Sequence, residues 1–254
     1  MKIFLVITAF MLLAGCAGMQ PVTVNVFKKN SASFAIGQLQ EKTVGEPMVV
    51  EENLYFITAP VGANEYRPPS QGGAAYPLIT EGMVFTPYGR LGNGDTLYTR
   101  RDFRPVTSQG ETVKWDYCIA VNKSGAAYGD AACRLGLVRK WEDSPDDVVE
   151  MKQVYREGSV KRVLVYNGKL NNVLKLTYLE YRTDFRVPAV HQELTYDLSE
   201  SMIIKFKNMS IQIVEASSST IRFVVESTMD GATSVQNTED LAPDRNEPKP
   251  VNAI

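Results

Sequence analysis

The stretches Met209-Ser210-Ile211-Gln212-Ile213-Val214-Glu215 and Thr220-Ile221-Arg222-Phe223-Val224-Val225-Glu226 decide the expected fold. In both, every second residue is apolar, from Ile211 to Ile213 and from Ile221 to Val225. A period of two places alternate side chains on opposite faces of a β-strand. The two stretches therefore predict neighbouring strands that each bury one face, joined by a turn over 217–219.

Further strand-like runs come before this pair, and short turn sequences separate them. The runs are Arg162–Tyr166, Val173–Arg182, Val190–Leu198 and Met202–Phe206. The turn residues are Asn167-Gly168, Asn171-Asn172, Ser199-Glu200 and Lys207-Asn208. Closely spaced short strands with few helical patterns predict a mainly β fold, an antiparallel β-sandwich or barrel-like sheets.

The N-terminal half carries weaker strand signals. Met48–Val50 and Leu54–Ile57 predict a hairpin that turns over Glu51–Asn53. Residues 59–95 are rich in Gly and Pro, which is typical of long loops. Strands are also expected over Thr96–Phe103 and Thr112–Val121, where Val113, Trp115, Tyr117 and Ile119 would share the buried face. Val148–Tyr155 suits either a strand or a helix.

The chain begins with Lys2, an apolar run and the sequence Leu13-Ala14-Gly15-Cys16. The apolar run is shorter than the roughly 20 residues of a spanning helix, and a positive start before a short apolar run is typical of a cleaved signal. The segment resembles a bacterial lipoprotein signal peptide, which implies that Cys16 receives the lipid and becomes the new N-terminus. Two acyl chains suffice for stable membrane attachment. Ala17 in the following position favours the outer membrane, by resemblance to enterobacterial lipoproteins.

A second resemblance rests on Glu193-Leu194-Thr195-Tyr196-Asp197-Leu198-Ser199 and on Tyr178-Leu179-Glu180-Tyr181-Arg182, within Arg162–Glu226. This region resembles the C-terminal part of uncharacterised bacterial envelope lipoproteins. The resemblance implies a β fold and an envelope location, and it implies no activity.

These signals divide the chain into five segments. They are a signal peptide (1–15), a lipidated tether with a first strand (16–45), an N-terminal β region with long loops (46–157), a C-terminal antiparallel β region (158–227) and a tail (228–254). The tail has three prolines, five acids and few large apolar residues, so it is expected to be disordered because it cannot repay its ordering entropy.

Composition and cysteine usage narrow the possible partners. The chain has 254 residues, 44% of them hydrophobic, and a net charge of −2, so no basic excess suggests nucleic acid. With Cys16 used for lipid, Cys118 and Cys133 remain as a pair in an oxidising compartment, which predicts a disulfide. The alternative, a zinc or catalytic thiol, needs further Cys or His nearby, and His191 is the only histidine.

Candidate catalytic patterns are weak, and the chain is predicted to be no enzyme, without metal or cofactor. His191, Glu193 and Asp197 are every second residue or multiples of it along a predicted strand, so they lie on the same face. This indicates a polar face of the strand rather than a Ser-His-Asp triad. Other patterns considered are the acids Glu180, Asp184 and Glu193 as a glycan-hydrolysing set, Asp143, Asp146 and Asp147 as calcium ligands, and Gly89–Asp95 as a phosphate loop. Chance pairing explains the first set of acids better, and a solvated loop explains the three aspartates better. A hairpin loop explains Gly89–Asp95 better.

Two features favour binding. Aromatic residues lie in or beside the loop-rich segment, and loop aromatics can anchor a partner, although they can equally cover the ends of a sheet. The candidates for binding are Tyr66, Tyr76, Phe85 and Tyr88, with Tyr55 and Tyr98 nearby. Exposed strand edges can also receive a partner strand. We therefore expect a lipid-anchored interaction or assembly factor on the periplasmic side of the outer membrane, with envelope proteins as partners. The alternatives are a binding module for a glycan, a lipid or another small ligand, and a carboxylate hydrolase.

Overall fold

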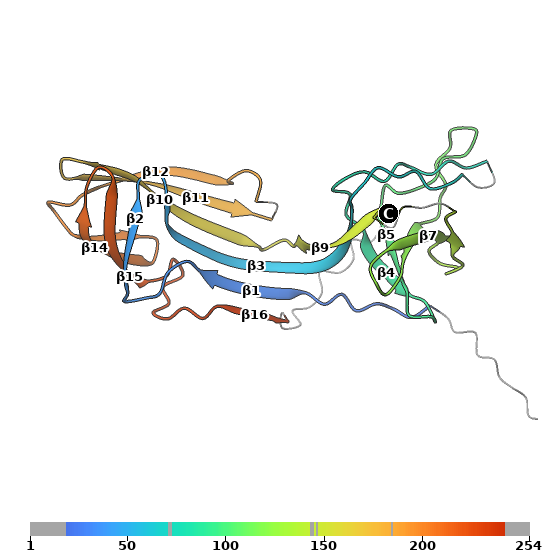
Figure 1. Cartoon of the computed structure of the whole chain (residues 1–254), viewed down its shortest axis with the longest axis horizontal. Helices are drawn as coiled ribbons and strands as arrows, with labels where there is room; N and C mark the ends of the chain where they lie inside the picture. Colours follow the sequence, from blue (N-terminus) through green and yellow to red (C-terminus); the bar gives the residue numbers. More distant parts are fainter. Residues whose placement is uncertain (1–18, 71–72, 143–144, 146, 184, 242–254) are drawn as a thin grey trace, which may run out of the picture. The chain divides into compact units, whose positions relative to one another are not determined.

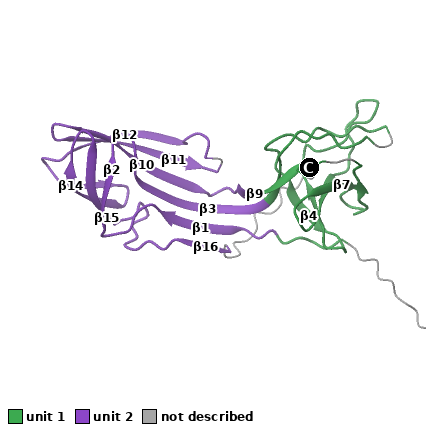
Figure 2. Ribbon diagram, in the orientation of Figure 1, with its two compact units in different colours: residues 1–23, 59–152 green, residues 24–58, 153–254 purple. Residues whose placement is uncertain are grey.

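The structure, a computed structural model, describes residues 19–70, 73–142, 145, 147–183 and 185–241. All regular structure in these residues is β, and the strands pair antiparallel (Figure 1). The described residues form two compact units, unit 1 from those within 1–23 and 59–152 and unit 2 from those within 24–58 and 153–254 (Figure 2). The predicted mainly β, antiparallel fold is confirmed.

Unit 2 holds two sheets. Its strands are β1 (Phe27–Ala32), β2 (Leu39–Thr43), β3 (Pro47–Gly62, shared with unit 1), β9 (Val149–Tyr155, also shared), β10 (Val160–Leu170), β11 (Val173–Arg182), β12 (Val190–Asp197), β13 (Ile203–Phe206), β14 (Met209–Ala216), β15 (Thr220–Ser227) and β16 (Thr238–Leu241). One sheet has the order β12-β11-β10-β3-β1-β16, with β9 on β3, and the other has the order β13-β14-β15-β2 (Figure 1).

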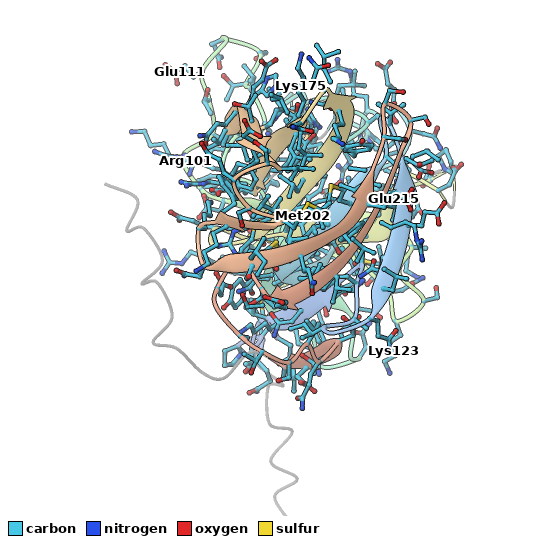
Figure 3. All side chains as sticks on the ribbon, turned by 90° about the vertical axis from the view of Figure 1, so that its left-hand side faces the viewer. Arg101, Glu111, Lys123, Lys175, Met202 and Glu215 are labelled. Carbon is cyan, nitrogen blue, oxygen red and sulfur yellow. A yellow bond between two sulfur atoms is a disulfide. The ribbon has the colours of Figure 1, made fainter. Side chains whose placement is uncertain are left out.

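The core of unit 2 lies between these two sheets, as in a sandwich. Ile211, Ile221 and Phe223 from the four-stranded sheet pack with Leu164 and Tyr178 from the larger one, and all five are at most 1% exposed. Burial of such apolar area is the main favourable contribution to folding. The opposite face of the four-stranded sheet is exposed at Gln212 and at Glu215, which is labelled in Figure 3.

Unit 1 is built on a five-stranded sheet of order β4-β5-β6-β7-β8. Its strands are β4 (Thr86–Arg90), β5 (Thr96–Thr99), β6 (Tyr117–Val121), β7 (Ala127–Ala132) and β8 (Arg139–Lys140). Both faces of this sheet carry buried residues, because Ile119 belongs to one apolar cluster and Cys118 to another. The predicted disulfide is present: Cys118 and Cys133 are bonded, with Cα atoms 5.2 Å apart.

The predicted strands of the C-terminal half agree with β10 to β15, and within the stretch 148–155 residues Val149–Tyr155 form a strand rather than a helix. The prediction of a hairpin that turns over Glu51–Asn53 is wrong. Residues 47–62 form one continuous strand, in which Glu51 pairs with Ala32 on β1 and with Arg162 on β10. Strand neighbours on both sides satisfy the backbone of this polar segment, so it does not turn.

Three further expectations differ from the structure. The units divide near residues 58 and 152 rather than at 45 and 157, because β1, β2 and the first part of β3 belong to unit 2. β6 begins only at Tyr117, and Trp115 is 57% exposed. Asn167-Gly168 lies at a bulge inside β10, where Gly168 has φ 102° and the pairing with β11 shifts register.

The tail also differs from its prediction over residues 228–241. Met229 is buried in the core of unit 2, and β16 pairs with β1. These contacts supply the burial and the backbone partners that the sparse apolar content did not suggest. Residues 242–254, the signal segment and Cys16 lie outside the described residues. In the described part of the chain, no helix is long and apolar enough to span a bilayer.

Candidate functional site

The predicted binding aromatics lie in unit 1, and two of them are in its interior. Tyr76 is 2% exposed and Phe85 is 0% exposed. The ring of Phe85 packs edge-on against Phe103 with centroids 5.3 Å apart, and that of Tyr76 packs edge-on against Tyr117 at 5.3 Å. Neither ring is open to a partner in this structure.

Tyr66 and Tyr88 are half-buried. Tyr66 packs against Trp141 with tilted rings whose centroids lie 4.9 Å apart, and Tyr88 packs against the apolar cluster around the disulfide. The four aromatics therefore do not gather on one surface. A binding role for Tyr66 and Tyr88 stays a prediction.

A buried carboxylate explains why Tyr76 is held inside. Asp130 is 1% exposed and accepts hydrogen bonds from Arg139 Nη2 at 2.7 Å and from Trp141 Nε1 at 2.5 Å. The Arg139 guanidinium lies 5.2 Å from the centroid of the Tyr76 ring. Burial, and then the Asp130 charge, raise the pKa of Tyr76, so its hydroxyl stays protonated. Because Asp130 is paired and enclosed, we interpret this cluster as structural.

A second buried carboxylate, Glu180, lies in unit 2. It accepts hydrogen bonds from Tyr178 OH at 2.6 Å, Lys207 Nζ at 3.0 Å and Arg182 Nη2 at 2.8 Å. Burial alone would raise the pKa of Glu180, but these three donors outweigh it and lower the pKa to about 2. The group is therefore ionised and fully partnered, which favours a structural role over general acid catalysis.

Lys207 reaches this carboxylate from the turn between β13 and β14. Its Nζ lies 4.4 Å from the centroid of the Tyr178 ring, and its backbone has φ 53°. A left-handed backbone costs a residue other than glycine roughly 1–2 kcal/mol. The contacts of the ammonium group with Glu180 and Tyr178 offset this cost, so the cluster ties the four-stranded sheet to the larger one.

A cavity of about 410 Å³ lies beside β1, β3 and β10 in unit 2. Glu51 and Arg162 line it, with Asp230 from the segment after β15. Glu51 accepts a hydrogen bond from the Met229 N–H at 2.9 Å, and Arg162 Nη1 bonds Asp230 at 2.9 Å and lies 3.8 Å from Glu51. The charges of this cavity are therefore largely balanced by internal pairs.

Burial raises the pKa of Glu51, although the Met229 N–H and the Arg162 charge act against it. A raised pKa means that ionisation costs folding free energy, and this cost appears as the pH rises above the ordinary glutamate value of 4.5. Replacing Glu51 by Gln keeps an acceptor for Met229 without that cost. We expect Glu51→Gln to raise the free energy of unfolding at pH 7 and to have less effect at pH 4, as measured by urea denaturation.

The neighbouring Glu52→Gln is the matched control. Glu52 is paired with Lys161 at 3.1 Å, and although burial would raise its pKa, the bonds from Lys161 and Ser31 lower it. Its replacement should therefore slightly destabilise the protein at pH 7, the opposite sign. A Glu51→Gln protein that is less stable than wild type at pH 7 would contradict the burial argument.

The most open feature of unit 2 is the edge formed by β12. The Leu198 N–H donates to the Asn172 carbonyl at 2.8 Å, which sets the alternation of bonded pairs between β12 and β11. The N–H and C=O groups of His191, Glu193 and Thr195 then point away from β11. Within the described residues they have no hydrogen-bond partner, and all three side chains are exposed.

The two edges of the four-stranded sheet, β13 and β2, are shorter and partly capped. On β13, Ser201 Oγ bonds both the N–H of Ile203 at 3.0 Å and its carbonyl at 2.9 Å, and Tyr196 OH donates to the Lys205 carbonyl. On β2, the Thr43 N–H donates to Glu46 Oε2. Native proteins commonly block edges because free backbone groups recruit other strands. β12, with eight residues, is the longest edge strand in the described sheets.

The predicted catalytic patterns do not converge. His191 and Glu193 are exposed on β12, Glu180 is buried in its ion cluster, and Asp184 lies outside the described residues. Asp147 accepts a hydrogen bond from Asn64, while Asp143 and Asp146 are not described. Among the described residues, no three His, Cys, Asp or Glu side chains form a group that could hold a metal.

No family model, curated protein or solved structure matches this chain. The sequence analysis did not identify Glu51 and Arg162 as site residues. The face of the strand on which Arg162 lies could have indicated its position. Arg162 shares parity with the buried Leu164 and Tyr166, so its charge had to lie at the edge of the core.

Proposed function

We propose that this protein is a lipid-anchored, non-enzymatic interaction factor of the bacterial cell envelope. In this proposal, Cys16 carries the lipid and holds the protein on the periplasmic face of the outer membrane. The partner is an envelope protein that adds an extended segment to β12. The observation that carries the proposal is the uncapped edge at His191, Glu193 and Thr195, next to edges that side chains cap.

The side chains beside this edge define the partner segment. Leu194 and Tyr196 are partly buried and pack against the core of unit 2, whereas Glu193 and Thr195 are exposed on the other face. An added strand presents alternate side chains to these two faces. The proposed partner is thus an extended segment with apolar residues on one face and polar or basic residues on the other.

Replacing Glu193 by Pro tests the edge directly. Proline lacks the outward N–H of residue 193, and an edge strand tolerates it where that N–H faces solvent. We expect Glu193→Pro to abolish a partner crosslink formed by a photoreactive residue at Thr195, while the protein remains folded by circular dichroism. The crosslink would be measured in intact cells and its product identified by mass spectrometry.

Glu193→Ala is the control, because it removes the same carboxylate and keeps the N–H. It should retain the crosslink. Equal crosslinking in the Pro variant, or equal loss in both variants, would contradict docking through the backbone. A Cys16→Ala protein secreted by another signal peptide tests the anchor, and it should lose or weaken the crosslink if the lipid brings the two proteins together.

A further inference from the structure

A cavity of about 630 Å³ lies in unit 1, on one face of the five-stranded sheet. Thr96 on β5 pairs with Arg90 on β4 and with Val121 on β6. Side chains of paired residues lie on the same face, so these three form a row across the floor of the cavity, with Tyr98 two residues along. The volume suits a small molecule.

The wall of the cavity is the turn between β6 and β7. Asn122 Oδ1 accepts hydrogen bonds from Ser124 N at 3.0 Å, Ser124 Oγ at 2.7 Å and Ala126 N at 3.0 Å, which fixes this turn. Lys123 extends from it along Gly94. A Cβ at Gly94 would lie 2.4 Å from Lys123 Cε, so the glycine leaves the room that the lysine stem occupies.

The cavity carries an unbalanced positive charge. Arg90 and Lys123 line it, and its described lining contains no acidic residue. Within the described part of the chain, neither side chain forms an ion pair or a hydrogen bond. The cavity of unit 2 differs, because Arg162 there is paired with Asp230. Two free cations in one cavity attract an anion.

We propose that this cavity binds a phosphate monoester carried on a small hydroxyl-bearing body, such as a sugar phosphate. The guanidinium fork of Arg90 and the ammonium of Lys123 suit a doubly charged phosphate. The hydroxyl groups of Thr96 and Tyr98 can donate and accept, as the hydroxyls of a sugar require, and Ser124 Oγ, which donates its proton to Asn122, can still accept. This site is in unit 1 and is independent of the proposed edge on β12.

Calorimetric titration of the full-length protein tests the site with glucose 6-phosphate, inorganic phosphate and glucose as probes. We expect glucose 6-phosphate to bind more tightly than inorganic phosphate, and glucose to give no measurable heat. Arg90→Ala and Lys123→Ala should each weaken the binding of glucose 6-phosphate about tenfold or more, because each removes a charged hydrogen bond.

Arg101→Ala is the charge-matched control, since Arg101 is exposed in unit 1 and does not line the cavity. It should leave the affinity unchanged. Absence of binding by glucose 6-phosphate, together with absence of flotation that depends on phosphatidic acid, would overturn the proposal. Equal weakening by Arg101→Ala and Arg90→Ala would also overturn it, because it indicates an unspecific charge effect. Thermal melts of each variant exclude unfolding as the cause of lost binding.

A phosphate monoester can also be a lipid headgroup. Flotation of the non-lipidated Cys16→Ala protein with phosphatidylcholine vesicles, with and without phosphatidic acid, distinguishes the two sources. Flotation that needs phosphatidic acid and is lost in Arg90→Ala supports the headgroup. Binding of glucose 6-phosphate without flotation supports the soluble ester.

Discussion

Replacing Glu180 by Gln should destabilise the protein by about 3 kcal/mol at pH 7. The pKa of Glu180 is about 2 in the folded protein, against an ordinary value of 4.5, because Tyr178, Lys207 and Arg182 donate to it. A lowered pKa contributes stability that is fully present above pH 4.5 and is lost as the pH falls toward 2. Urea denaturation followed by far-UV circular dichroism should therefore show a large difference between the two proteins at pH 7 and little near pH 2.

Glu193→Gln is the control for this experiment. Glu193 lies on the neighbouring strand β12 and is exposed, so its replacement should change stability by less than about 0.5 kcal/mol. A Lys207→Met variant removes the ammonium and keeps the apolar stem on Tyr178. The double variant with Glu180→Gln should lose less than the sum of the single losses, because both remove the same ion pair. Additive losses would show that the pair is not coupled.

The C-terminal strands were predictable because local signals there agree with one another. β11 covers the same residues, Val173–Arg182, as the prediction, since apolar residues alternate along it and Asn171, with φ 54°, turns the chain just before it. β14 and β15 follow from the alternation around Ile211 and Phe223, both of which are buried. Where side-chain period and turn chemistry indicate the same element, the sequence suffices.

The errors lie where a distant partner decides the structure. Glu51 and Asn53 resemble turn residues, yet β1 and β10 bond both sides of their strand. The residues after Thr228 resemble a disordered tail, yet the Glu51 carboxylate binds the Met229 N–H across a sequence separation of 178 residues. No local pattern encodes such contacts.

The candidate sites divide in the same way. Sequence reasoning named loop aromatics, but Phe85 and Tyr76 are buried, because their rings are needed to fill a core that short strands leave incomplete. It recognised that an open strand edge would matter, without indicating which one. That choice depends on caps such as the Tyr196 hydroxyl on the Lys205 carbonyl, a contact between strands of two different sheets.

Removing the disulfide should destabilise unit 1 by about 3 kcal/mol, the value that the chain-entropy model gives for a loop of about 15 residues. Cys118 and Cys133 are separated by 15 residues and are both 0% exposed. Replacing both by Ala removes the cross-link without leaving a free thiol. Trp115 and Trp141, the only tryptophans of the chain, both lie in unit 1. Their fluorescence therefore reports the unfolding of the unit that contains the disulfide.

The same unfolding curve measured with reductant separates the cross-link from the packing of the two sulfur atoms. Reduced wild type keeps both side chains in place, so it should lose most of the 3 kcal/mol that the double variant loses, about 2 kcal/mol or more. The double Ala variant should not respond to reductant. If reduction leaves the tryptophan transition of wild type unchanged while the double variant is destabilised, the loss comes from the volume removed at Cys118 and Cys133. The stability of unit 1 would then rest on core packing rather than on the closed loop.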